Sequence, residues 1–218
     1  MNEPAAQAQL ISVNVGATRT FYAGKRSFES AIGKRPVAGR VVLRGVNLAG
    51  DDQADRNAHG GPDRALYAYA REDYRWWEAQ LERALEPGLF GENLTVGGID
   101  VSGALVGEEW RVGEAVLRVT SPRIPCYKLA HVVGEPDFVK RFAQAHRPGA
   151  YLAVVTEGDV AAGDRVEVTW RPPRGLALDT FTRIYFAERE LAAELLEAPG
   201  MTAAWREWAQ REIAERIS

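Results

Sequence analysis

Cys126 is the only cysteine in a chain of 218 residues, and its neighbours give it a chemical setting. Pro122 and Pro125 precede it, and because proline fixes φ and lacks a backbone donor, they predict a stiff turn after a strand-like run. Arg123 and Lys128 flank the sulfur. A nearby positive charge favours the thiolate, which attacks electrophiles and binds soft metals. The alternative is a buried cysteine that packs as a small apolar side chain.

A second candidate region is the polar segment 50–64, which is too rich in Asp, Asn and Gly to form a regular element. Its acidic residues and His59 are of the types that bind Mg, Mn or Zn, although Asp and Asn also cap turns. Gly60 and Gly61 supply backbone freedom or expose amides to a phosphate. We therefore expect a loop at this position, where a scaffold often holds a site.

Three further polar residues have chemistry that suits a ligand. Lys34 and Arg35 could hold an anion, with a solvated turn as the alternative. Asn93 follows a tight glycine turn at the start of a predicted strand, and its amide can donate to and accept from a planar heterocycle. The alternative for Asn93 is that its side chain stabilises the turn.

The composition predicts a globular, cytoplasmic protein. Apolar residues make up 46% of the chain, which is ample for a core. The formal net charge of -3 gives no basic footprint for nucleic acid or for an anionic membrane, so neither is expected as a partner. One cysteine cannot form an intrachain disulfide, and neither a signal-like start nor a membrane-spanning apolar run is visible.

The sequence pattern of the first 170 residues predicts mostly short strands, which would position the candidate site residues. Alternating and β-branched runs predict strands at residues 10–15, 40–46, 65–70, 94–96, 101–105, 109–112 and 115–120. Residues 151–155 and 164–170 predict a closing hairpin. Helical apolar spacing predicts packing helices at 72–85 and 137–146. Such short, turn-punctuated strands are typical of a barrel or sandwich.

The character of the chain changes after the stiff, basic linker RPPR at 171–174. Helices are predicted at about 180–187, 188–197 and 202–217. These helices are too short to hold a large core alone, so we expect them to pack on the barrel or on a second copy of the chain in a homodimer. The predicted organisation is a β-barrel domain at 1–173 and a three-helix appendix at 174–218.

Four segments, taken in order, resemble the successive signatures of the MOSC domain family, the molybdenum cofactor sulfurase C-terminal domain. They are IGKRPV at 32–37, GDDQAD with HGG at 50–55 and 59–61, FGENL at 90–94, and PRIPCYKL at 122–129. Their order and spacing are similar to the YiiM-type branch, and the helical end is similar to the three-helix appendix of that branch. The resemblance therefore covers nearly the whole chain.

The resemblance implies an α+β fold with a mixed, pyruvate-kinase-like β-barrel that binds the molybdenum cofactor, Mo-molybdopterin. It places Cys126 at the position of the protein ligand to molybdenum, and His59 and Asn93 where they would orient the pterin or the substrate. The anionic tail of the cofactor is expected on cations and exposed amides. The candidates are Lys34, Arg35, Gly60, Gly61, Arg64, Arg123 and Lys128.

The resemblance also implies reduction of N-hydroxylated compounds, such as hydroxylamino-purine bases, to amines, which is a detoxification. One cysteine cannot hold an iron–sulfur cluster, and no glycine-rich dinucleotide fingerprint follows a predicted strand. Electrons are therefore expected from a separate flavoprotein or from an iron–sulfur or flavodoxin-type carrier. Two alternatives stay open: a molybdopterin carrier without turnover, and a metal-independent enzyme with Cys126 as nucleophile and His59 as base.

Overall fold

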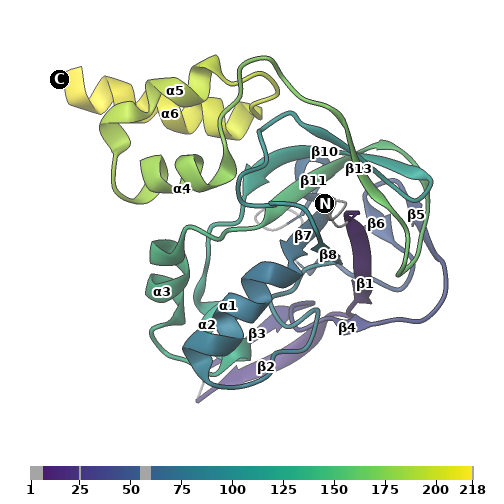
Figure 1. Ribbon diagram of the computed structural model, residues 1–218. Coiled ribbons are helices and arrows are strands. Elements are labelled where there is room, and N and C mark those ends of the chain that lie inside the picture. The colour runs from purple at the N-terminus through teal and green to yellow at the C-terminus, as the bar shows by residue number, and fades with distance from the viewer. Residues whose placement is uncertain (1–6, 25, 55–59, 218) are drawn as a thin grey trace, which may run out of the picture.

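The structure is a computed structural model, and it describes residues 7–24, 26–54 and 60–217. Its centre is a mixed sheet of eight strands in the order β13-β9-β10-β11-β7-β8-β1-β4 (Figure 1). The strands are β1 (Gln9–Val15), β4 (Arg35–Pro36), β7 (Leu66–Ala70), β8 (Leu94–Gly97), β9 (Glu109–Val112), β10 (Ala115–Pro122), β11 (Ala150–Thr156) and β13 (Val166–Trp170). Neighbouring strands are antiparallel except for the parallel pair β7 and β8.

The sheet curls but does not close into the predicted barrel. Strand β1 meets the start of β13 through the bridge between Gln9 and Arg165, and the Leu10 N–H donates to the Asp164 carbonyl. Within the described part of the chain, no longer ladder joins these two strands. The predicted α+β class is confirmed, and the barrel is corrected to a curled, open sheet.

Strand β7 separates two hydrophobic cores, because successive side chains of a strand point to opposite faces. Leu66 and Ala68 belong to the larger core inside the curled sheet. Tyr67 and Tyr69 belong to a second, aromatic core. This alternation places the Tyr67 ring on the side of the sheet that the helices cover.

Three helices enclose the aromatic core: α1 (Arg71–Leu81), α2 (Tyr127–Val133) and α3 (Phe138–Ala145). Trp77 stacks on Phe142 with ring centroids 6.0 Å apart and tilts against Phe138 at 4.6 Å. Both predicted helices are therefore present with their apolar faces inward. Helix α1 ends four residues earlier than predicted, because Glu82 takes a left-handed conformation with φ of 51°.

Two smaller sheets and one short helix complete the first part of the chain. They comprise the three-stranded sheet β12 (Gly158–Val160), β5 (Val41–Arg44) and β6 (Asn47–Leu48), the hairpin β2 (Arg19–Ala23) and β3 (Arg26–Ser30), and the 3-10 helix η1 (Pro62–Arg64). The predicted hairpin of 151–155 with 164–170 is wrong, because β12 intervenes and pairs with β5. The predicted strand 101–105 is also wrong, since only Leu105 forms a bridge, to Ala177.

The last helices pack against one end of the sheet (Figure 1). They are α4 (Leu178–Phe186), η2 (Arg189–Leu191), α5 (Ala193–Glu197) and α6 (Ala203–Ile217). Phe181 and Leu195 belong to the same hydrophobic core as Trp110 and Leu117 of the sheet. No helix among the described residues is long and apolar enough to cross a membrane. A domain boundary at 173/174 and a homodimer stay predictions.

Candidate functional site

The four sequence segments that resemble family signatures all contribute residues to one pocket of about 100 Å³. Of the predicted site residues, the pocket brings together Lys34, Arg64, Asn93, Arg123, Cys126 and Lys128. Arg35 instead lines a neighbouring cleft. His59 lies outside the described residues. We call this space the Cys126 pocket.

Cys126 stands where strand β10 gives way to helix α2. The strand ends at Pro122, and the helix begins at Tyr127, so Cys126 is its N-cap residue with extended φ and ψ of -131° and 172°. The two prolines predicted a stiff turn, and the turn is present, but the helix that follows it was missed. Cys126 is partly exposed and lines the pocket, whereas Leu129 one turn later is buried in the aromatic core.

Arg123 is a buried guanidinium, and no carboxylate among the described residues is its partner. Its side chain donates to the Phe90 carbonyl and lies 5.0 Å from the centre of the Tyr67 ring. It forms no ion pair with any residue in the described ranges. Burial acts to lower the pKa of Arg123, but Tyr151, Tyr67 and Cys126 nearby raise that pKa on balance. A buried positive charge of this kind is costly unless an anion accompanies it.

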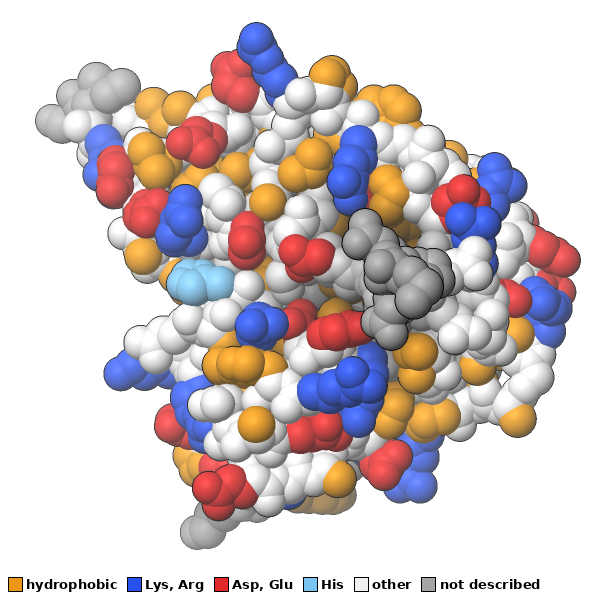
Figure 2. All heavy atoms as spheres, viewed as in Figure 1, with side chains coloured by type: hydrophobic (Ala, Val, Ile, Leu, Met, Phe, Trp, Pro, Cys, Tyr) orange, Lys and Arg blue, Asp and Glu red, His pale blue; other side chains and the backbone are white. Residues whose placement is uncertain are grey.

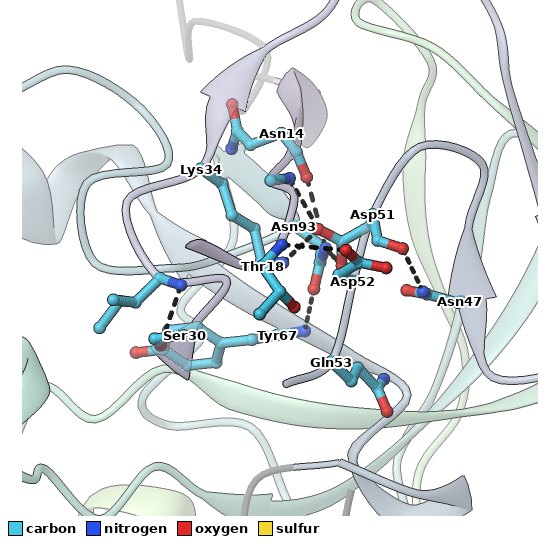
Figure 3. A network of polar contacts seen from close by, with 12 residues as sticks. Asn14, Thr18, Ser30, Lys34, Asn47, Asp51, Asp52, Gln53, Tyr67 and Asn93 are labelled. Carbon is cyan, nitrogen blue, oxygen red and sulfur yellow. Dashed lines mark hydrogen bonds and ion pairs between the residues drawn. The ribbon is translucent and has the colours of Figure 1, made fainter. Parts of the chain in front are cut away.

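Lys34 and Asn93 are joined through Asp51 (Figure 3). The Asp51 carboxylate forms a buried ion pair with the Lys34 ammonium and accepts hydrogen bonds from the Gly16 N–H at 2.8 Å and from the Asn93 amide at 2.8 Å. Burial lowers the pKa of Lys34, and Asp51 opposes that effect. The charge of Lys34 is therefore largely neutralised inside the protein.

The Asn93 side chain is also occupied within the fold. Its second amide hydrogen bond goes to the Asn14 carbonyl at 3.3 Å, and its oxygen accepts the Tyr67 N–H at 3.2 Å. These bonds tie the start of β8 to β1 and β7. These bonds go to residues far away in the sequence and not to the local glycine turn, and the predicted contact of Asn93 with a pterin or substrate stays a prediction.

Gln53 ties together the described ends of the polar segment 50–64. Its amide donates to the carbonyls of Val46 and Ala65 at 3.0 and 3.2 Å, and its oxygen accepts the Gly61 N–H at 3.2 Å. Gly61 has φ of 89°, a conformation that favours glycine. Gly60 and Gly61 do not line the Cys126 pocket, and the Gly61 amide serves the loop.

Two tyrosines of the pocket wall were missed as site residues. Tyr67 and Tyr151 are directly opposite each other on β7 and β11, with ring centroids 5.3 Å apart. Burial raises the pKa of Tyr67 well above its ordinary value, and its hydroxyl donates to the Pro148 carbonyl at 2.8 Å. Arg64 lies 5.6 Å from the Tyr151 ring centre. Both tyrosines lie in predicted strands, where nothing in the local sequence distinguishes them. The pairing of β7 with β11 brings them together.

The pocket combines the Cys126 thiol with the Arg123 guanidinium, which pairs with no carboxylate of the described residues. Such a site suits a soft metal and an accompanying anionic group. Among the residues that the structure describes, no cluster of three or more His, Cys, Asp and Glu could hold a metal ion. On the face in Figure 2, acidic and basic side chains are interspersed, as the net charge of -3 leads one to expect.

Comparisons of the sequence and of the fold with known proteins agree on one family. The sequence model of the MOSC domain matches residues 55–167. The uncharacterized protein YflK of Bacillus subtilis is 36% identical over 200 residues, 90% of each chain. A Gibberella moniliformis protein named "Reductase" is 32% identical over 149 residues, 66% of this chain and 26% of that protein. The crystal structure of YiiM from Geobacillus stearothermophilus superposes with a TM-score of 0.77 and 30% identity, covering 94% of this chain and 98% of the other.

Proposed function

The chain belongs to the MOSC domain family, as its four segments predicted, and from this we propose that it is a molybdenum-cofactor-dependent reductase of N-hydroxylated compounds such as hydroxylamino-purine bases. The observation that carries the proposal is the presence, in one pocket, of Cys126 and the buried Arg123, which pairs with no carboxylate in the described part of the chain. The name of the Gibberella moniliformis relative supports reductive chemistry.

The residues present fit the two chemically distinct parts of this cofactor. A thiolate at Cys126 suits molybdenum, and the charge of Arg123 favours that thiolate. Arg123 and Lys128 suit a phosphate tail, because the guanidinium of arginine matches phosphate oxygens bidentately. A pocket of about 100 Å³ is smaller than the roughly 300–1,000 Å³ of most ligand sites, so it would enclose only part of the cofactor.

When bound, the cofactor would supply the two-electron reduction. In the net reaction the N–O bond breaks, the nitrogen becomes an amine, the oxygen leaves as water, and two electrons and two protons are consumed. Arg123 would hold negative charge in the buried pocket, and Asp51 would keep Lys34 fixed at the pocket wall. We propose that the electrons come from a separate flavoprotein or a small iron–sulfur or flavodoxin-type carrier.

The first test measures molybdenum and pterin in protein expressed in a host that makes the cofactor. Cys126→Ala should lose the metal, and Arg123→Gln should lower pterin retention roughly tenfold or more, because a charge-assisted hydrogen bond is worth about 1.5–3 kcal/mol. Arg118→Gln is the matched control, since Arg118 is exposed on β10 and paired with Glu109. Molybdenum at the parent's stoichiometry in Cys126→Ala would show that the ligand assignment is wrong.

The second test measures turnover of an N-hydroxylated base. The loaded protein should be inactive with NADPH alone and active with a chemical reductant, or with a flavin reductase and a small electron carrier. Loaded protein without turnover under any reductant would favour a cofactor carrier. Turnover by metal-free protein that alkylation of Cys126 abolishes would favour a cysteine enzyme, and turnover with NADPH alone would exclude the need for a separate donor.

A further inference from the structure

A larger cleft adjoins the Cys126 pocket at Lys34. Its volume is about 740 Å³, within the usual range for small-molecule sites. One side is the β2–β3 hairpin, which lies beside α2 in Figure 1. The residues lining this hairpin cleft are Arg19, Phe21, Gly33, Lys34, Arg35, Pro36, Glu86, Pro87, Leu89, His131 and Val132.

Two guanidinium groups in the hairpin cleft pair with no acidic side chain of the described residues, Glu86 of the same cleft included. Neither Arg19 nor Arg35 forms an ion pair or a side-chain hydrogen bond with any residue in the described ranges. Arg19 is held in place, because its guanidinium carbon lies 4.6 Å from the centre of the Phe21 ring. Two arginines match the charge of a phosphate monoester, about -1.5 to -2 at neutral pH. Arginine is also the side chain that binds phosphate oxygens bidentately.

The same cleft presents aromatic and apolar surface. The Phe21 and His131 rings meet edge to face with centroids 5.8 Å apart, and Leu89 and Val132 also line the cleft. His131 also meets the Phe28 ring edge to face at 5.3 Å, and Phe28 stacks on Phe21, so the three rings form one cluster. Aromatic side chains held in this way favour a planar ring as their partner.

At two glycines of the cleft region, Gly33 and Gly88, the backbone lies very close to a neighbouring residue. Gly33 has φ of 74°, and a Cβ there would lie 3.1 Å from the Arg19 guanidinium. Gly88 has φ of 87°, and a Cβ there would lie 2.7 Å from the Lys34 carbonyl carbon. The segment that carries Lys34 and Arg35 is therefore packed tightly against the turn at Gly88, which gives the cleft a firm wall.

We propose that the hairpin cleft binds a planar aromatic ring that carries a phosphate monoester, of which a nucleoside 5′-monophosphate is the simplest cellular example. The phosphate would lie between Arg19 and Arg35, and the ring would lie against Phe21 and His131. This binding requires neither molybdenum nor Cys126. It is independent of the proposed reductase function, and its failure would leave that function untouched.

The test is calorimetric titration of the full-length protein with adenosine 5′-monophosphate. We expect saturable binding at one site per chain, and at least tenfold weaker binding of both adenosine and inorganic phosphate, which each lack one half of the ligand. Arg19→Gln and Arg35→Gln should each weaken binding about tenfold or more. Arg26→Gln, on the same hairpin but outside the cleft, and Arg64→Gln, in the Cys126 pocket, should bind as the parent does.

Hydrogen exchange of the unmodified protein gives a second readout that needs no variant. The nucleotide should protect amides in residues 19–36 and 128–133, which carry most of the cleft. No saturable binding through the millimolar range would overturn the proposal. So would loss of binding in Arg64→Gln but not in Arg19→Gln. A lower pterin content in Arg19→Gln, without nucleotide binding by the parent, would assign the cleft to the tail of the cofactor instead and would equally overturn it.

Discussion

Asp51 is the residue on which the polar side of the Cys126 pocket depends. Its side chain is almost fully buried, as is that of Lys34, with 1% and 7% exposed. Asp51→Asn should lower the free energy of unfolding by about 3–5 kcal/mol near pH 7, because it leaves the Lys34 ammonium buried without its counter-ion. Urea denaturation measures this loss.

The pH dependence of that loss has a definite sign. Burial lowers the pKa of Lys34 below its ordinary value of 10.5, and removing Asp51 removes the main group that opposes this. Between the folded and unfolded pKa values the unfolded chain binds more protons, so the stability of Asp51→Asn should rise with pH toward about 10. The double variant Lys34→Met/Asp51→Asn should recover much of the loss; strictly additive losses would show that the pair does not interact.

Glu92 provides a second, opposite pH dependence. Its carboxylate is fully buried and accepts hydrogen bonds from the Gly88 N–H at 2.6 Å and from Tyr74 and Thr95, both at 2.8 Å. Burial raises the pKa of Glu92 above its ordinary value of 4.5, and these donors only partly oppose it. The folded protein therefore holds this proton to a higher pH than the unfolded chain does.

Glu92→Gln should consequently gain stability relative to the parent as the pH rises. From about pH 4.5 to the folded pKa, the contribution of Glu92 falls with pH, by at most about 1.4 kcal/mol per pH unit, while glutamine does not titrate. The measurement is the difference in unfolding free energy between variant and parent from about pH 4 to about pH 8. A difference that stays constant or declines over that range contradicts the prediction.

At this scale the sequence indicated the chemistry but not the partners. The motif order placed Cys126, Arg123 and Lys34 in one site, and the structure brings all three to one pocket. The bond between Asn93 and Asp51 joins residues 42 positions apart. Asp51 lies in a loop and Asn93 directly before β8, so only the tertiary fold brings these two side chains together, and no local pattern could have predicted the contact.

At the scale of elements, the turn at Gly88 packs directly against the backbone of Lys34. Gly88→Ala should cost about 3 kcal/mol or more, because it adds overlap with the Lys34 carbonyl to the strain of a left-handed backbone. Gly134→Ala is the matched control, with φ of 81° and nothing within 4 Å of its Cβ, and should cost only about 1–2 kcal/mol. Thermal and urea unfolding compare the two. Equal losses would mean that the close approach at Gly88 is unimportant.

The elements that the sequence missed share a physical cause. Helix α2 has seven residues and directly follows two prolines, so its signal is short and is masked by turn formers. The β2–β3 hairpin alternates around only two inward rings, Phe21 and Phe28, which stack at 5.3 Å. The wrong partners assigned to β11 and β13 reflect long-range pairing, which local periodicity does not report.

At the scale of the whole molecule, the C-terminal helices share one core with the sheet. The Phe181 ring lies 4.9 Å from Trp205, and both belong to the cluster that contains Trp110. Backbone bonds from the Val106 N–H to the Leu176 carbonyl and from the Leu178 N–H to the Ala104 carbonyl, 3.0 and 3.1 Å long, add to this attachment. Removing the helices would expose apolar surface of the sheet, at a cost of roughly 25 cal/mol per Å².

The helices and the sheet should therefore unfold together, although the sequence predicts two domains. Native-state hydrogen exchange in increasing urea should show amides of 181–209 and 110–119 opening with the same denaturant dependence. The β2–β3 hairpin serves as the internal control, because most of its residues are exposed and it should open at lower free energy. If the C-terminal helices instead open alone at a free energy close to that of the hairpin, the shared core does not bind them to the sheet, and the boundary at 173/174 separates two independent folding units.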